Sequence, residues 1–447
     1  MVTRRGIAAL SVALVLVLAG CAADSAAFRT TQPETTVNDT ATTERPTTTA
    51  VEVTEEYSVN VRGEELPIDP NSTFARVQSL VGTDVRPQTV TVIDGSSREA
   101  DAGYYADRSF FDIMGLEATD YSTDGASGVT YADGQVRITT RNASDAEVER
   151  VLAHEFTHTV QMRSGMTADL DSMAYTRRTT DYAMTRQALV EGGAVYVTDA
   201  YAERFQSDTV RQSNRVAAEY ERGPAGNRYL WAPYYFGYQY VSDAIDSPDE
   251  LSSVYENHPE TTEQLLHGET PEAEPPAELE LGTDATGDWY RTKADTKGEL
   301  VTRIVLRSEL AKGVSTTAAT GWGNDRAFVY EHASRDETAV AWAVRWDSAT
   351  EADEAQAAFE AYADRRASGD DVAVRVERVT SETLVVFAGS DEFVESARAD
   401  GANGRVTVGT NESAAALPST PVPRAAPEAP RGPPTASPTP SPRPAAL

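Results

Sequence analysis

Cysteine occurs once in this sequence of 447 residues, at Cys21. A single thiol excludes an intramolecular disulfide and a thiolate metal site. Histidine is also scarce, with five residues in the whole chain. The apolar run Ile7–Ala19 has about thirteen residues, which is too few for a stable membrane-spanning helix of roughly 20 residues. Any membrane attachment is therefore expected to be something other than a spanning helix.

Positive charge is the second scarcity. The chain has 39 Lys and Arg against 70 Asp and Glu, a formal net charge of −31, and lysine contributes only Lys293, Lys297 and Lys312. No basic cluster is present, so a nucleic acid partner is excluded because a polyanion would be repelled. An acidic, lysine-poor surface resembles that of proteins from halophilic archaea. We interpret the charge as a solvation property and not as a substrate preference.

The first 21 residues are predicted to be an export signal, because Arg4 and Arg5 precede the apolar run. The sequence Leu-Ala-Gly-Cys at 18–21 resembles a lipobox, in which Cys21 is lipidated after cleavage. The arginine pair is also compatible with twin-arginine export. These features predict a lipoprotein on the extracellular face of the cell membrane, held there by lipid on Cys21.

Two segments have compositions that cannot bury enough apolar surface to fold. Residues 22–61 are rich in Thr and predict a disordered tether, and residues 411–447 are rich in Pro and predict a disordered tail. Between them we expect an α+β fold in two units, residues 62–282 and 283–410, separated after the proline-rich Pro271–Pro276. No internal repeat or phosphate-binding glycine loop is present.

The most informative segment is Asn142–Met166. Ser144 followed by Glu147 predicts a capping box that begins a helix. Apolar residues then recur every fourth position, which predicts one buried helical face; they are Val148, Leu152, Phe156 and Val160.

His154, Glu155 and His158 form an HExxH motif within this predicted helix. Two histidines four residues apart project from one face, so both imidazoles can bind one zinc ion, and the glutamate then takes a proton from the zinc-bound water. The metzincin continuation is excluded, because Gln161 and Ser164 occupy the positions where Gly and His are required. The remaining type of site is His₂Glu, with a glutamate from a second helix.

Glu191 lies 33 residues beyond His158, in the predicted helix Gln187–Tyr201. Its Glu-Gly-x-Ala context resembles the third-ligand helix of the gluzincins, the thermolysin-like clan, and this resemblance implies Glu191 as the third metal ligand. Asp199 follows two turns later and has two readings. It either hydrogen-bonds a ligand histidine from behind, or it is a solvated helix carboxylate.

A wider resemblance follows from the order of motifs along the chain. The chain resembles a family of secreted or lipid-anchored HExxH proteins of bacteria and haloarchaeal surfaces. The resemblance implies a gluzincin-like (zincin-like) metallopeptidase core with an additional α+β C-terminal subdomain, and it supplies no substrate. The motifs that carry it are His154–His158, Glu191 in its Glu-Gly-x-Ala setting, Pro233-Tyr234 with Gly237, Thr262–His267 and Gly321–Arg326.

Three residues are candidates for stabilising an oxyanion. His267 has three readings, as the transition-state donor that a histidine supplies in thermolysin-like enzymes, as a residue that orients a neighbour, or as a helix-capping residue. Tyr234 and Tyr235 are alternatives in the aromatic segment Tyr229–Ile245, which we interpret as a loop followed by a helix. Strand Gln135–Thr140 either pairs with a peptide substrate at a sheet edge or is an ordinary sheet strand.

The C-terminal unit shows a pattern of helices and strands but no spacing for chemistry of its own. Asp325 and Arg326 are predicted to form an ion pair or a turn there. The other elements predicted in this unit are helices at 299–312, 352–366 and near Glu392, and strands at 328–332, 338–346, 372–379 and 384–388.

Taken together, these patterns predict a zinc metallopeptidase that hydrolyses polypeptides, as an endopeptidase or an aminopeptidase-like enzyme. Manganese or cobalt fits the same His₂Glu ligand set. The alternative is a non-catalytic surface protein that uses a zincin-like core to bind polypeptides in envelope assembly or adhesion.

Overall fold

The computed structural model describes residues 58–93, 108–116, 126–206, 210–284, 286–368, 372–402 and 404–410. Helices and strands are mixed throughout this part of the chain, which confirms the predicted α+β class. The predicted signal with Cys21, residues 22–57 of the predicted tether and the predicted tail 411–447 lie outside the described residues. Among the helices that are described, none has the length and apolar character needed to cross a bilayer.

The N-terminal part contains a sheet of four strands in the order β1-β2-β4-β3. Strands β1, β2 and β4 run parallel, and β3 pairs antiparallel with β4. Helices α1 and α3 pack on each other through Phe74 and Phe156, whose ring centroids are 5.0 Å apart. The elements are β1 (Val61–Gly63), α1 (Pro70–Val81), β2 (Val90–Val92), α2 (Arg108–Ile113), β3 (Ser127–Thr130), β4 (Val136–Thr139) and α3 (Asp145–Ser164).

The predicted strand at Gln135–Thr140 exists as β4, but it does not lie at an edge. It pairs with β2 on one side and with β3 on the other, so its main-chain groups have partners within the sheet. The edge next to α3 is formed by β3 instead. The ordinary-strand reading of β4 is therefore correct, and the predicted peptide-pairing role of this strand is wrong.

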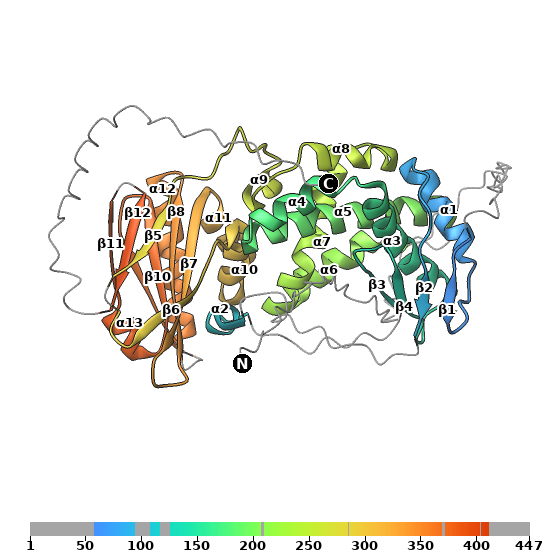
Figure 1. The fold of residues 1–447 in the computed structure, drawn as a ribbon. Helices are drawn as coiled ribbons and strands as arrows, with labels where there is room; N and C mark the ends of the chain where they lie inside the picture. The colour runs from blue at the N-terminus through green and yellow to red at the C-terminus, as the bar shows by residue number, and fades with distance from the viewer. Residues whose placement is uncertain are drawn as a thin grey trace, which may run out of the picture.

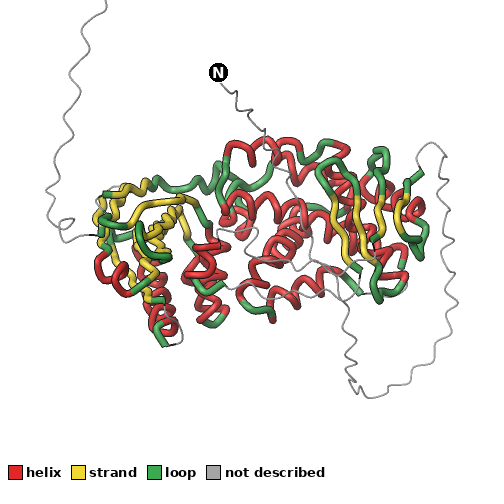
Figure 2. Tube along the Cα trace, turned by 60° about the horizontal axis from the view of Figure 1, so that its bottom comes forward, coloured by secondary structure: helices red, strands yellow, loops and turns green. Residues whose placement is uncertain are grey.

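The middle of the molecule is helical and lies between two sheet regions (Figures 1 and 2). Segment Tyr229–Ile245 was predicted as a loop followed by a helix, but α7 is one continuous helix with Pro233 inside it. Proline removes one backbone hydrogen bond from a helix interior; Pro233 is buried, and α7 packs against α5. The elements are α4 (Ala168–Thr176), α5 (Thr180–Phe205), α6 (Gln212–Arg222), α7 (Ala225–Ala244), η3 (Pro248–Glu250), α8 (Leu251–Glu256) and α9 (Thr262–His267).

The C-terminal part contains a five-stranded antiparallel sheet, β6-β7-β8-β10-β9, and a three-stranded sheet, β11-β12-β5. Strand β5 spans the predicted boundary between residues 282 and 283 and pairs with β12. The elements are β5 (Glu280–Thr283), β6 (Trp289–Asp295), α10 (Gly298–Glu309), α11 (Lys312–Ala319), β7 (Trp322–His332), β8 (Thr338–Trp346), α12 (Ala349–Arg366), β9 (Ala373–Arg378), β10 (Thr383–Gly389), α13 (Asp391–Ser396), β11 (Arg398–Ala402) and β12 (Arg405–Gly409).

One hydrophobic core joins the central helices to the five-stranded sheet. It combines buried residues of α2, α5 and α7 with residues of α10, α12, β8 and β10. Helix α2 precedes the HExxH helix in the chain, yet it lies beside α10 (Figure 1). There the ring of Phe110 meets the edge of Trp342, with centroids 5.4 Å apart. The two predicted units therefore share a core.

The predicted ion pair or turn at Asp325 and Arg326 is wrong. Both residues lie in β7, where successive side chains point to opposite faces of the sheet. Asp325 is 1% exposed, and its carboxylate accepts hydrogen bonds from the backbone N–H groups of Lys297 and Gly298 at 2.7–3.0 Å. It thereby satisfies the first free N–H groups of α10.

Candidate metal centre

Helix α3 begins and ends where local sequence chemistry requires. Ser144 accepts a hydrogen bond from the backbone N–H of Glu147 at 3.3 Å, and the Glu147 carboxylate accepts one from the Ser144 backbone at 2.8 Å. Gly165 ends the helix with a φ of 78°, a conformation that glycine adopts without a Cβ clash. The predicted capping box is confirmed, and it fixes the helix that carries His154, Glu155 and His158.

The structure brings His154, His158 and Glu191 together, with one ligand atom from each facing the other two. Glu191 Oε2 lies 3.3 Å from His154 Nε2 and 3.2 Å from His158 Nε2, and the two nitrogens are 3.2 Å apart. Ligands bound tetrahedrally to one zinc ion at about 2.0–2.1 Å lie roughly 3.3 Å from each other. The three atoms therefore have the spacing of one triangular face of such a site.

The chemistry of Glu191 also fits a bound cation. Its side chain is fully buried, and the partners found for its carboxylate among the described residues are the Nε2 atoms of the two histidines. A buried carboxylate is costly unless positive charge compensates it, and a metal ion between these three atoms would supply that charge. The neighbouring histidines already hold this carboxyl ionised, because His158 and His154 outweigh burial and lower the pKa of Glu191 to about 2.

The contact with Glu191 raises the pKa of His158. Burial lowers its pKa, but the Glu191 carboxylate raises it more strongly, to about 9 in the metal-free protein. Burial lowers the pKa of His154. A metal ion bound at the two Nε2 atoms therefore has to displace a proton from His158, so metal affinity is expected to fall at low pH.

Two glutamines hold the far nitrogens of the histidine rings. Gln161 Oε1 lies 2.7 Å from His158 Nδ1, and Gln212 Oε1 lies 3.1 Å from His154 Nδ1. An amide oxygen only accepts, so each ring donates from Nδ1, and Nε2 is the atom that can bind a metal once it carries no proton. Gln161 in turn donates to Val190 O and Tyr255 Oη, at 2.8 and 2.7 Å. The side chain that breaks the metzincin pattern thus orients a ligand.

Asp199 fits neither of its two readings. It is 5% exposed, so it is not solvated, and it makes no direct contact with either ligand histidine. Its carboxylate accepts hydrogen bonds from the backbone of Gln212 at 2.7 Å and from the hydroxyl of Ser213. Asp199 thereby caps α6 and positions Gln212, which contacts His154. Asp199 thus reaches His154 only through Gln212, and not directly as the first reading predicted.

Glu155 is held by the edge strand β3. Thr130 donates its hydroxyl to Glu155 Oε2 at 2.6 Å, and both residues are buried. Gly128 faces the same carboxylate, because a Cβ at this position would lie 2.5 Å from Glu155 Oε1. Burial raises the pKa of Glu155 to about 8, although His158 and Thr130 both act to lower it. In the metal-free protein Glu155 is therefore mostly protonated at neutral pH, and it has to lose this proton before it can act as a general base.

The two candidate tyrosines lie in different places. The Tyr234 ring stacks at 18° to that of His154, with centroids 6.3 Å apart, and is 3% exposed. Tyr235 stacks on Tyr220 at 4.8 Å. The structure therefore places Tyr234 next to the candidate ligand His154, whereas Tyr235 contacts α6.

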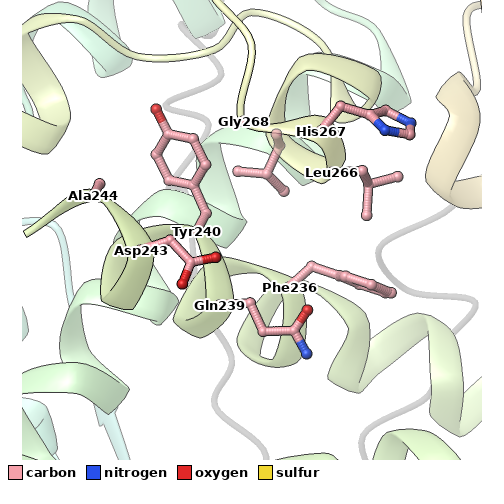
Figure 3. Close-up of a pocket in the computed structure, with 9 residues that line it drawn as sticks. Phe236, Gln239, Tyr240, Asp243, Ala244, Leu266, His267 and Gly268 are labelled. Atoms are coloured by element: carbon pink, nitrogen blue, oxygen red, sulfur yellow. The ribbon is translucent and has the colours of Figure 1, made fainter.

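His267 lies in a separate environment. Its Nε2 is 3.0 Å from the buried carboxylate of Glu299, whose hydrogen bond raises the pKa of His267. It also lines a pocket of about 310 Å³ between α7 and α9 (Figure 3). The lining of this pocket includes none of the three metal ligands and not Glu155. This geometry supports the second reading, in which His267 positions a neighbouring group.

Comparisons with known proteins bear on the C-terminal part only. A family model described as a domain of unknown function (DUF8575) matches residues 288–420. No curated protein and no solved structure matches the chain. The matched region begins next to β6 and contains none of His154, Glu155, His158 and Glu191, so the chemistry of the centre has to be argued from its own geometry.

Thr130, Gly128 and Gln212 are site residues that the sequence did not indicate. Thr130 and Gln212 lie 25 and 58 residues from the side chains they contact. Gln161 was noticed only as a mismatch to another motif. Its spacing of three from His158 on one helix was the available signal, because such residues are surface neighbours.

Proposed function

We propose that this protein is a zinc-dependent metallopeptidase with a gluzincin-like His₂Glu centre. The observation that carries the proposal is the triangle of ligand atoms from His154, His158 and Glu191, which lie 3.2–3.3 Å apart. The buried carboxylate of Glu155, the residue after His154 in α3, accompanies this triangle. Two nitrogens and one oxygen are the donor set of catalytic zinc sites that leave a fourth position open.

A zinc ion at such a site lowers the pKa of a water molecule and polarises a carbonyl group. The roles of the protein groups follow from their contacts. Glu155 accepts the proton of the attacking water on its carboxylate and passes it to the amine that leaves the cleaved peptide bond. Thr130 orients this carboxylate, and Gln161 and Gln212 hold the histidine rings. Tyr234 is the residue we assign to the developing oxyanion; the mechanism does not require His267.

An extended polypeptide is the substrate class that the edge strand favours. Strand β3 is one of the two edge strands of its sheet, β1 being the other, and Gly128 of β3 lies against the proposed general base. A peptide that pairs with β3 through main-chain hydrogen bonds would pass beside Glu155. The lipobox-like sequence at Cys21 extends the proposal to a lipid-anchored enzyme on the outer face of the cell membrane.

One observation favours the alternative of a non-catalytic polypeptide-binding protein. All four central side chains are nearly inaccessible, with His154 the most exposed at 4%. A catalytic centre has to admit its substrate, whereas a structural one does not. The open position and the retained Glu155 favour the enzyme, because a purely structural zinc site has four protein ligands and needs no base.

The replacement Glu155→Gln separates the two functions. It keeps the size and the capacity to accept from Thr130 but removes the base, so peptide hydrolysis should fall by roughly 10²–10⁴-fold. Zinc content, measured by elemental analysis, should stay near that of the wild type. His158→Ala is the matched control and should lose the zinc as well. Equal turnover of Glu155→Gln and wild type would exclude Glu155 as the base.

A further inference from the structure

A second group of acidic residues meets at the junction between α9 and the five-stranded sheet. Glu263 lies in α9, Glu274 lies seven residues beyond it, and Asp347 follows the end of β8. One carboxylate oxygen of each lies within 4.8 Å of the other two. The backbone fixes this arrangement, because Gln264 donates to Glu274 O at 2.7 Å and Asp347 donates its N–H to Gly321 O at 2.9 Å.

Glu263 distinguishes this group from the many exposed acids of the chain. Its side chain is 4% exposed, and it neither accepts a hydrogen bond nor forms an ion pair with any described residue. The nearby carboxylate of Glu299 is equally buried but is compensated by Arg303 and His267. A buried carboxylate that lacks such partners requires an explanation. Glu263 instead lies next to two further carboxylates, those of Glu274 and Asp347.

The surrounding backbone brings more negative charge to the same place. A Cβ at Gly323 would lie 2.6 Å from Asp347 Oδ1, and one at Gly321 would lie 2.3–2.6 Å from the Glu351 carboxylate. Glu351 Oε2 is buried and accepts no hydrogen bond from the described part of the chain. The acidic groups thus gather at one place, and those that are ionised repel one another in the absence of a cation.

We propose that Glu263, Glu274 and Asp347 bind a calcium ion. The donor set consists of oxygen alone, which hard cations prefer and which differs from the His₂Glu centre. Calcium takes oxygen ligands at about 2.3–2.6 Å, so two ligands of one ion lie up to roughly 5 Å apart, as these oxygens do. Glu274 is half-buried and Asp347 is exposed, which leaves room for water to complete the six to eight ligands.

The proposed ion would join elements of both predicted units. Its ligands come from α9 and the segment after it on one side, and from the end of β8 on the other. Helix α9 is tied to α5 as well, since Thr262 donates its hydroxyl to Asp181 at 2.6 Å. Calcium at this site would therefore stabilise the contact between the sheet and the helix that carries Glu191.

Calcium binding is tested on the full-length protein, stripped with a calcium chelator and titrated at constant high ionic strength. We expect one calcium ion per chain by isothermal titration, and a rise of roughly 3–6 °C in Tm at saturating calcium. Glu263→Gln and Asp347→Asn should lose both effects. Glu354→Gln, which removes an exposed charge from α12, should keep both.

Several results would overturn the proposal. These are the absence of saturable binding to the wild type, unchanged binding in Glu263→Gln and Asp347→Asn, or a preference for magnesium over calcium. A higher Tm of Glu263→Gln in chelator, with no calcium bound to the wild type, would show instead that Glu263 is a protonated acid. Asp347 is exposed, so Asp347→Asn decides the question if Glu263→Gln does not fold.

Discussion

At the scale of single residues, the candidate metal centre depends on side chains behind the ligands. Gln161 is buried and contacts His158, Val190 and Tyr255, whereas Gln212 is half-buried and contacts His154. Such outer contacts fix the tautomer and the orientation of a ligand histidine. The two glutamines therefore make the same contact with the candidate ligand histidines, but only Gln161 also has buried partners in the core.

Replacing either glutamine with alanine should separate these roles. Both Gln161→Ala and Gln212→Ala should weaken zinc affinity by roughly 10–100-fold, because each frees a ligand ring. Gln161→Ala should also lower the free energy of unfolding by about 1–3 kcal/mol, since it leaves buried partners unsatisfied. Competition with a zinc chelator measures the first effect and denaturant unfolding of the metal-free protein the second. Unchanged zinc affinity in both variants would contradict the assigned role.

Asp181 gives a prediction for pH. Burial raises its pKa to about 7, although Thr262 donates two hydrogen bonds that lower it. A raised pKa means that the folded state binds the proton more tightly than the unfolded state, where the value is about 4. The contribution of Asp181 to stability is therefore fully present below about pH 4 and is lost as the pH rises to about 7.

The variant Asp181→Asn isolates this contribution. Its amide oxygen can still accept from Thr262, but it carries no charge to desolvate. The free energy of unfolding of the variant relative to the wild type should increase between pH 4 and pH 7, by an amount on the order of a few kcal/mol. Urea unfolding at a series of pH values measures the difference. A difference that is constant with pH would show that Asp181 is ionised throughout this range.

At the scale of elements, α5 and α7 approach each other through glycine. A Cβ at Gly192 would lie 2.1 Å from the Gly237 carbonyl carbon, and one at Gly237 would lie 1.9 Å from Ala188 O. Gly192 therefore contacts α7 and not the HExxH helix. Gly193 faces the HExxH helix instead, because a Cβ at this position would lie 3.1 Å from Gln161 Nε2. The position of Glu191 thus depends on two different helix contacts.

The substitution Gly192→Ala should therefore be severe. Backbone atoms cannot move aside as a flexible side chain can, so we expect a loss of at least about 3 kcal/mol in the free energy of unfolding, together with weaker zinc binding. Gly313→Ala in α11 is the matched control, because nothing lies within 4 Å of its Cβ position. It should be neutral or stabilise by up to about 1 kcal/mol. Thermal unfolding of both variants provides the comparison.

At the scale of the whole molecule, the shared core couples the two predicted units. Phe110 is fully buried and meets Trp342 of the five-stranded sheet. The core around it also contains residues of α5, the helix that supplies Glu191. Neither unit can lose its packing without exposing apolar surface on the other. The metal centre and the sheet are therefore expected to unfold together.

We expect a single thermal transition at the same temperature by far-UV circular dichroism and by tryptophan fluorescence. Phe110→Ala should lower that temperature for both probes equally, with a cost of about 3–5 kcal/mol, because it leaves a cavity between the units. Val210→Ala, at a position 60% exposed, is the control and should change little. Two separate transitions in the wild type would show that the units are independent.

The sequence by itself determined the local parts of the protein. The capping box and the four-residue spacing of His154 and His158 lie within one helix, so their geometry follows from helical periodicity. The elements predicted around Trp342 and in α12 were recovered for the same reason, because strand and helix periods are written in neighbouring residues. Glu191 was predicted from the resemblance of its Glu-Gly-x-Ala context to the gluzincins, and the structure places it beside both histidines.

Only the tertiary structure decided which distant residues meet. Strand order placed β3 at the edge and Thr130 on Glu155, and a capped helix brought Gln212 to His154. It also decided that Asp325 caps α10 and that Glu263 faces other carboxylates. These contacts join segments far apart in the chain and leave no periodic trace in it. Packing, and not local propensity, therefore sets the environment of the candidate metal ligands and of the acidic cluster.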